Sequence, residues 1–405
     1  MPPPNESLPN LEQVLTGIDV APGRAASAAA TLHSRVIGLE AVQRAQWEAL
    51  AAAPLEANGF FDPGFVLASA RHARGGRGAQ ALVAMAEGEL SGLLPVMPAS
   101  RVYRLPLPVL VATQPYNLLT TPLLWQRDPV AAAGALIDAA AASGAALLVL
   151  PMLALQGPAR DALQAAIDAR GLDWRVDASH QRAVLETELD DETYLRSGLG
   201  AKKLKELRRQ GHRLDELGAV AVTTARAPEA VAPALERFLT LEAKGWKGRR
   251  GTGLGQHAGD ARFVRSMAAD LSARGAFEVT ELMLDGRTIA AGLVIRQADR
   301  ALFFKIAYDE TLARLSIGVQ LTLALTRAAI ADPTLRLFDS TASADHPMID
   351  HLWRERLSVG DLYIQTRAND PIGPLLGRLI RLRRAARDQV KRLYHHIRNR
   401  LETSP

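Results

Sequence analysis

The stretch of sequence that decides the fold is ALFFKIAYDETLARLSIGVQLTLALTRAAIADPTLRLFDS, residues 301–340. Its apolar spacing predicts a strand, a buried helix and a second strand, over 301–308, 319–330 and 335–338. Ser316 and Gly318 stand where the helix begins, as an N-cap and as a residue that permits close backbone approach. A helix that starts after a strand offers unpaired amides and the positive end of its dipole, so it can hold a phosphate. The same pattern also fits an ordinary βαβ packing unit that binds nothing.

Length and composition favour a globular chain of two domains. The 405 residues are 48% hydrophobic and 22% charged, which supplies ample core for two domains. The absence of cysteine excludes disulfides, thiolate metal sites and a cysteine nucleophile. The N-terminal residues show no secretory signal pattern, and no apolar run is long and uninterrupted enough to span a membrane. We therefore expect a cytoplasmic protein, with peripheral contact to the inner membrane as an option.

Four segments follow one another along the chain. They are a disordered lead-in over 1–35, an N-terminal α/β unit over 36–180 that opens with a helix over 36–53, a C-terminal unit over 190–365, and a basic helix over 371–401. In the C-terminal unit, Asp285-Gly286 predicts a tight hairpin between strands 277–284 and 288–296. The N-terminal unit repeats the order hairpin, loop, helix and strand, which indicates two copies of one α/β unit.

Four motifs carry a resemblance to a known family. They are FLTLEAKGWKGRRGTG (238–253), LDGRTIAAGLVI (284–295), KIAYDE (305–310) and DSTASADHPMIDHLW (339–353). In this order they resemble GNAT-type acyltransferases of the CelD-like branch, which is associated with bacterial cellulose and exopolysaccharide biosynthesis. The resemblance covers 190–365 and, more weakly, 36–180. It implies an α/β fold with a mixed sheet, built as two tandem GNAT-like units as in FemAB-type transferases.

The resemblance also implies a donor site. Acetyl-CoA or another acyl-CoA would pair with the strand over 301–308 and place its pyrophosphate on the following helix N-terminus, with no metal involved. The cofactor-binding residues implied are Lys305, Ile306, Arg314, Ser316, Gly318 and Gln320. The phosphate loop is sparser in basic and glycine residues than is common in the family. FemAB-like relatives take aminoacyl-tRNA, so the identity of the donor stays open.

The implied reaction is direct acyl transfer to an amine or hydroxyl, which requires a proton acceptor and a proton donor for the leaving thiolate. Tyr308 ends the donor strand, and Asp339 and Ser340 end the neighbouring strand, so these three are the catalytic candidates. Tyr308 also fits a structural role as a half-buried aromatic, and Asp339 fits one as a turn cap.

Substrate-binding candidates lie in and around the glycine-rich loop 245–259 and in the last motif. Trp246 and Lys247 pair an aromatic platform with a cation, which suits a sugar or phosphorylated acceptor, although a solvated loop anchored by one tryptophan fits equally. Glu242 would orient this loop. His346 is the histidine of a motif region, and as a lone ligand it indicates no metal site.

The C-terminal segment concentrates the positive charge. Residues 371–405 hold nine Lys or Arg against two acidic residues, so the remainder is nearly neutral and no specific nucleic-acid partner is expected. The helix over 371–401 suits an anionic membrane surface, a packed position on the body, or an acidic polymer. Two functions follow: an acyltransferase acting on a small-molecule or saccharide acceptor of the cell envelope, or a catalytically silent scaffold of a polysaccharide biosynthesis complex at the membrane.

Overall fold

The computed structural model describes residues 32–113 and 115–402. Most of the predicted lead-in, 1–31, lies outside the described residues. Its last four residues belong instead to strand β1 (Leu32–Gly38), which pairs antiparallel with β2 (Gln80–Ala86). The predicted helix over 36–53 is therefore wrong in its first part: Val36 and Ile37 continue β1, as β-branched residues favour, and the helix α1 spans Arg44–Ala52.

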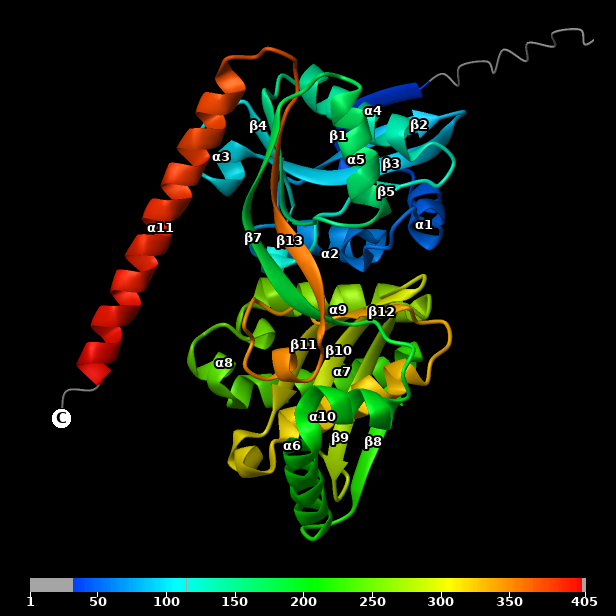
Figure 1. The fold of residues 1–405 in the computed structure, drawn as a ribbon. Helices are drawn as coiled ribbons and strands as arrows, with labels where there is room; N and C mark the ends of the chain where they lie inside the picture. Colours follow the sequence, from blue (N-terminus) through cyan, green and yellow to red (C-terminus); the bar gives the residue numbers. More distant parts are fainter. Residues whose placement is uncertain (1–31, 114, 403–405) are drawn as a thin grey trace, which may run out of the picture. The chain divides into compact units, whose positions relative to one another are not determined.

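A single mixed sheet runs through both halves of the described chain (Figure 1). Its strand order is β1-β2-β3-β4-β6-β13-β7-β12-β11-β10-β9-β8, with β5 paired to β3. The strands not yet given are β3 (Glu89–Pro98), β4 (Val109–Ala112), β5 (Leu123–Leu124), β6 (Leu147–Ala154), β7 (Trp174–Leu185), β8 (Val220–Ala225), β9 (Phe277–Leu284), β10 (Arg287–Gln297), β11 (Arg300–Tyr308), β12 (Leu337–Asp339) and β13 (Glu355–Gln365).

The strand order reads as two copies of one unit that have exchanged their last strands. From each outer edge inward, a run of antiparallel strands ends in one parallel pair, β4 with β6 in the N-terminal half and β11 with β12 in the C-terminal half. The last strand of the chain, β13, then pairs with β6 of the first half, and β7 pairs with β12 of the second. The two predicted units therefore share their central strands. The mixed α/β fold with two similar halves is confirmed.

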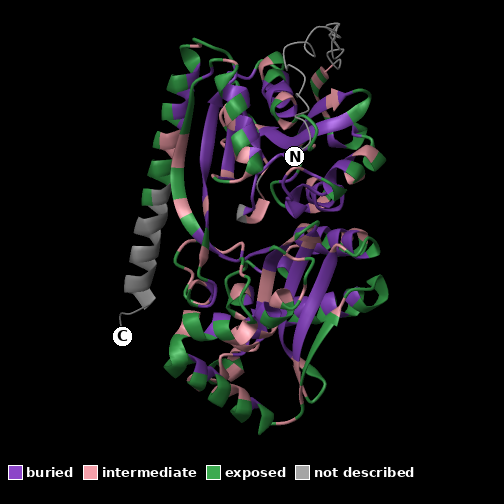
Figure 2. Ribbon diagram, turned by 45° about the vertical axis from the view of Figure 1, so that its right-hand side comes forward, coloured by how far each residue is buried: buried purple, intermediate pink, exposed green. Residues whose placement is uncertain are grey.

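Helices cover both faces of the sheet. In the N-terminal half α4 (Pro129–Ala142) packs on β1, β2 and β3, alongside α5 (Pro158–Asp168). In the C-terminal half α7 (Pro228–Lys244) and α9 (Ala258–Ala273) belong to one core, whereas α6 (Asp191–Asp215) and α10 (Ile317–Ile330) belong to the core on the opposite face. The strands between them are mostly buried and the outward helix faces exposed (Figure 2).

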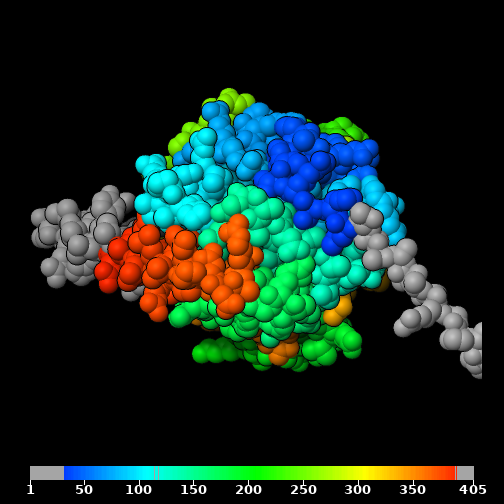
Figure 3. All heavy atoms as spheres, turned by 90° about the horizontal axis from the view of Figure 1, so that it is seen from above, coloured from blue at the N-terminus to red at the C-terminus, as the bar shows by residue number. Residues whose placement is uncertain are grey.

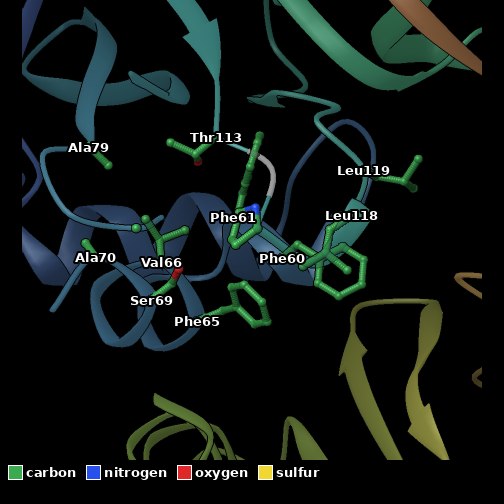
Figure 4. A pocket seen from close by; sticks show the side chains of 12 residues that line it. Phe60, Phe61, Phe65, Val66, Ser69, Ala70, Ala79, Thr113, Leu118 and Leu119 are labelled. Atoms are coloured by element: carbon green, nitrogen blue, oxygen red, sulfur yellow. The ribbon is translucent and has the colours of Figure 1, made fainter. Parts of the chain in front are cut away.

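An aromatic cluster joins the halves where α2 (Pro63–His72) packs on α9. Phe65 lies 5.2 Å from Phe263 and 5.8 Å from Phe304 between ring centroids, and Tyr116 stacks on Phe263 at 5.4 Å. Figure 4 shows Phe65 and Phe60 around a small apolar pocket beside α2, with Phe65 directed toward the strands of the C-terminal half. Burial of these large rings fixes the two halves against each other.

The helix α11 (Ile372–Glu402) follows β13, as predicted. Leu376 and Ile380 are buried against β4, β6 and β13, and Arg384 pairs with the buried Asp361 of β13. Among the described helices, none is long and apolar enough to cross a membrane.

Candidate active site

The strands β11 and β12 are parallel neighbours for only three residues, ending at the pair Leu302 and Asp339. Beyond this point they separate, and the Thr341 hydroxyl donates a hydrogen bond to the Phe303 carbonyl at 2.6 Å. The remainder of β11, up to Tyr308, therefore has an edge without a partner strand. An unpaired edge presents main-chain donors and acceptors that another extended chain can use.

A β-bulge sits in the middle of this edge strand. Leu293 of β10 pairs with Lys305, and the next residue pairs with Phe303, so Phe304 is the extra residue. A bulge turns the following side chain to the other face of the sheet. Phe303 joins the core around α10 and Phe304 joins the core around α7 and α9, as alternation requires. Because of the bulge, Lys305 lies on the same face as Phe304, with its ammonium over the Phe304 ring at 5.4 Å.

A pocket of about 280 Å³ lies against the free edge of β11. Its walls come from the end of α7, from α8 (Trp246–Arg249), from the end of β11 and from residues 346–348. The fold thus brings together six of the predicted residues: Glu242, Trp246, Lys247, Ile306, Tyr308 and His346. They lie up to 104 positions apart along the chain, which is why only the folded chain forms the pocket.

Two acidic residues hold α8 over the pocket. Glu310 accepts hydrogen bonds from the Trp246 amide and from Arg249, both at 2.5 Å. Buried Glu242 accepts from the Leu254 amide at 2.7 Å and lies 3.8 Å from the Lys247 ammonium. Glu242 therefore links α7 to the loop that follows α8. Glu310 was not among the predicted site residues.

Lysine and histidine side chains around the pocket have lowered pKa values. Burial lowers the pKa of Lys247, and the nearby Glu242 carboxylate partly offsets this effect. Burial also lowers the pKa of His346. The Asp350 carboxylate acts in the opposite direction, and the Lys247 ammonium lowers this pKa further. A histidine whose pKa lies below its usual value is neutral at pH 7, so it can accept a proton. Its Nδ1 faces the Met348 amide at 3.4 Å.

The N-terminus of α10 opens beside the same pocket. No acceptor among the described residues bonds the amides of Ile317, Gly318 or Val319. Ser316 occupies the predicted N-cap position but has a left-handed backbone, φ +52°, and its side chain makes no capping hydrogen bond. A Cβ at Gly318 would lie 3.1 Å from the Tyr308 ring and 3.5 Å from the Met348 sulfur. Gly318 therefore lets Tyr308 pack against the helix N-terminus.

Two further cofactor candidates lie apart from the pocket lining. Arg314 is exposed in the 3-10 turn that precedes α10. Gln320 donates its side-chain amide to the Leu207 carbonyl at 2.8 Å, so it ties α10 to α6.

The structure places Asp339 and Ser340 away from the pocket lining. Asp339 is fully buried and accepts a hydrogen bond from Arg182 of β7 at 2.7 Å and one from the Thr341 amide at 2.8 Å. Ser340 is also buried, and its hydroxyl accepts from the Ala342 amide at 3.2 Å. Asp339 and Ser340 therefore do not join Tyr308 at the pocket, as predicted catalytic residues would, because strand β7 enters the sheet beside β12 and supplies a buried cation to Asp339.

Comparison with known proteins gives one family match in the C-terminal half. Residues 201–346 match the family model described as an acetyltransferase (GNAT) domain. None of the curated proteins matches the chain.

Solved structures resemble the chain over both halves. The C-terminal domain of a putative lysylphosphatidylglycerol synthetase from Agrobacterium fabrum is 12% identical, with a TM-score of 0.52 over 83% of this chain and 95% of that chain. The structure of FemX is 10% identical, with a TM-score of 0.51 over 82% of this chain and 98% of that chain. Likeness at such identities shows a common fold and leaves the CelD-like branch a prediction.

Proposed function

We propose that the protein transfers an acetyl or longer acyl group from acyl-CoA to an amine or hydroxyl of a cell-envelope or polysaccharide-related acceptor. The observation that carries this proposal is the separation of β11 from β12, which leaves the β11 edge open beside the pocket and beside the amides of α10. The GNAT domain match supports acyl transfer in general.

The donor would use both features of the site. The pyrophosphate would bind the free amides at the start of α10, which combine hydrogen-bond donors with the positive end of the helix dipole. The extended pantetheine arm would pair with the free β11 edge. The Ile306 carbonyl on this edge accepts a hydrogen bond from Lys247 at 2.8 Å, so donor binding would exchange that contact for one with the arm.

Proton transfer would involve His346 and Tyr308. An amine acceptor is largely protonated at pH 7 and must lose a proton before it attacks the thioester. His346, which is neutral because burial lowers its pKa, would take this proton on Nδ1 and give up the long contact from the Met348 amide at 3.4 Å. The new C–N or C–O bond forms as the C–S bond breaks, and Tyr308 would donate a proton to the thiolate. Because Asp339 is buried against Arg182, we no longer propose it as the base.

Calorimetry with acetyl-CoA and desulfo-CoA tests this proposal. Gly318→Val should weaken CoA binding at least tenfold, which is about 1.4 kcal/mol, because the added methyl groups would displace the Tyr308 ring and crowd the amides. Ala328→Val, an exposed substitution at the other end of α10, is the matched control and should bind normally. Unchanged affinity in a folded Gly318→Val variant would remove the phosphate site.

The second candidate function is a catalytically silent scaffold at a membrane surface. It is favoured by an exposed apolar stripe on α11, formed by Ile372, Leu375, Leu379 and Leu382, which are 44–70% exposed. The described part of α11 lies along the surface of the molecule (Figure 3), and exposed arginines such as Arg378 flank the stripe. An apolar stripe bordered by cations suits an anionic lipid surface. Absence of CoA binding together with vesicle binding would favour the scaffold.

A further inference from the structure

Within the described residues 32–113 and 115–402, Lys305 has no partner of opposite charge. Its ammonium lies 5.4 Å from the ring centroids of both Tyr116 and Phe304, and it makes no hydrogen bond or ion pair with the described residues. A mostly buried ammonium normally has a carboxylate partner, because desolvating an unpaired charge is costly. The weak cation–π contacts with the Tyr116 and Phe304 rings offset only part of this desolvation cost.

The nearby carboxylates are already engaged elsewhere. Asp260 accepts from the Arg74 guanidinium at 2.7 Å and from the Tyr116 hydroxyl at 3.0 Å. Glu242 accepts from a backbone amide and lies beside Lys247. The charged groups around Lys305 are thus the cations Lys247 and Arg74 and the carboxylates Glu242 and Asp260.

Lys247 and Lys305 also repel each other. Each is largely removed from water, and the proximity of Lys247 adds to the effect of burial on the pKa of Lys305, which falls to about 8. The Lys247 ammonium donates a hydrogen bond to the carbonyl of Ile306, the residue after Lys305, at 2.8 Å, so the two lysines meet at the same edge of β11. An anion bound by both ammonium groups would offset their repulsion.

We propose that Lys247 and Lys305 form an anion subsite that binds a carboxylate or phosphate group of the acceptor. The inference rests on the proposed acyltransferase function and assigns its substrate class: an amine or hydroxyl compound with an anionic group near the reacting atom. The position fits the acceptor side of the site. Lys305 lies on the α7 and α9 face of the sheet with Phe304, whereas the free amides of α10 lie on the opposite face.

Titration of the lysine side chains by NMR tests the subsite directly. The probes are inorganic phosphate and, separately, acetate, and the Lys305 resonance is assigned by its loss in Lys305→Met. The Lys305 resonance should shift and then saturate as the anion is added. The protein should bind the anion at least tenfold more tightly when Lys305 is protonated than when it is neutral, so binding should weaken as the pH rises through about 8. The ion with the larger effect identifies phosphate or carboxylate as the preferred group.

Two controls separate this subsite from general charge effects. Lys202, exposed on α6, should respond only at concentrations where all surface lysines do. Lys247→Met should abolish the saturable response of Lys305, whereas Lys202→Met should not. Equal responses of Lys305 and Lys202 to both ions would overturn the subsite. Binding of acetyl-CoA, measured on the same samples, would show separately whether the acyltransferase proposal stands.

Discussion

Replacing Lys305 with methionine should stabilise the protein, although the lysine lies in the middle of a core strand. The lowering of the pKa of Lys305 from 10.5 to about 8 means that the folded protein disfavours the charged form. At 1.36 kcal/mol per pKa unit, this corresponds to about 3 kcal/mol at pH 7. Loss of the cation–π contacts with the Tyr116 and Phe304 rings would destabilise the variant by up to about 1 kcal/mol, which reduces this gain. We therefore expect Lys305→Met to raise the free energy of unfolding by about 2–3 kcal/mol.

The pH dependence of this difference follows from the sign of the pKa change. Between about pH 8 and pH 10.5 the unfolded chain binds more protons at Lys305 than the folded chain, so the wild-type protein gains stability as the pH rises through this window. The difference in free energy of unfolding between Lys305→Met and the wild-type protein should be constant below pH 8 and should nearly vanish above about pH 10.5.

Urea unfolding at a series of pH values measures this difference, and Lys202→Met supplies the matched loss of one positive charge at an exposed site. A destabilised Lys305→Met variant at pH 7, or a difference independent of pH, would refute the argument that Lys305 is a strained charge kept for binding. A stabilised variant that has lost its anion response is the combination expected of a functional residue that lowers stability.

The other predictions concern α11 and the buried ion pair. Replacing Leu375, Leu379 and Leu382 together with glutamine should reduce sedimentation with phosphatidylglycerol vesicles at least tenfold and leave the unfolding midpoint unchanged, since these side chains are exposed; undiminished sedimentation would argue against the lipid contact. Asp339→Asn should lower the free energy of unfolding by about 3–5 kcal/mol, because it leaves Arg182 charged and uncompensated in the core; wild-type stability in a denaturation experiment would contradict this.

Much of the secondary structure could be predicted from sequence because local interactions specify it. Asp285 and Gly286 both adopt positive φ, which a tight hairpin turn requires, and the strands β9 and β10 flank them as expected. Local signals also start helix α4, since the Asp128 carboxylate accepts a hydrogen bond from the Ala131 amide in its first turn and proline follows the cap.

The pocket could be predicted only in part. Tyr308 lines it because it ends the strand predicted over 301–308. Trp246 and Lys247 also line it, but they lie on the short helix α8, where the sequence predicted a loop. Asp339 also ends a predicted strand, yet it faces Arg182, which lies 157 positions earlier in the chain. No local pattern reports which strand becomes the neighbour of β12, so the partner of Asp339 could not be known in advance.

The sequence by itself determined the class of fold, the strand–helix–strand unit over 301–340 and the residues that could carry chemistry, because periodicity, caps and turn residues act over a few positions. The tertiary structure decided the exchange of β7 and β13 between halves and the bulge at Phe304. Simple alternation places Lys305 on the same face as Phe303, but the bulge moves it to the opposite face, beside Tyr116. That change depends on pairing with β10 and on packing between the halves, which are contacts between residues far apart in the chain.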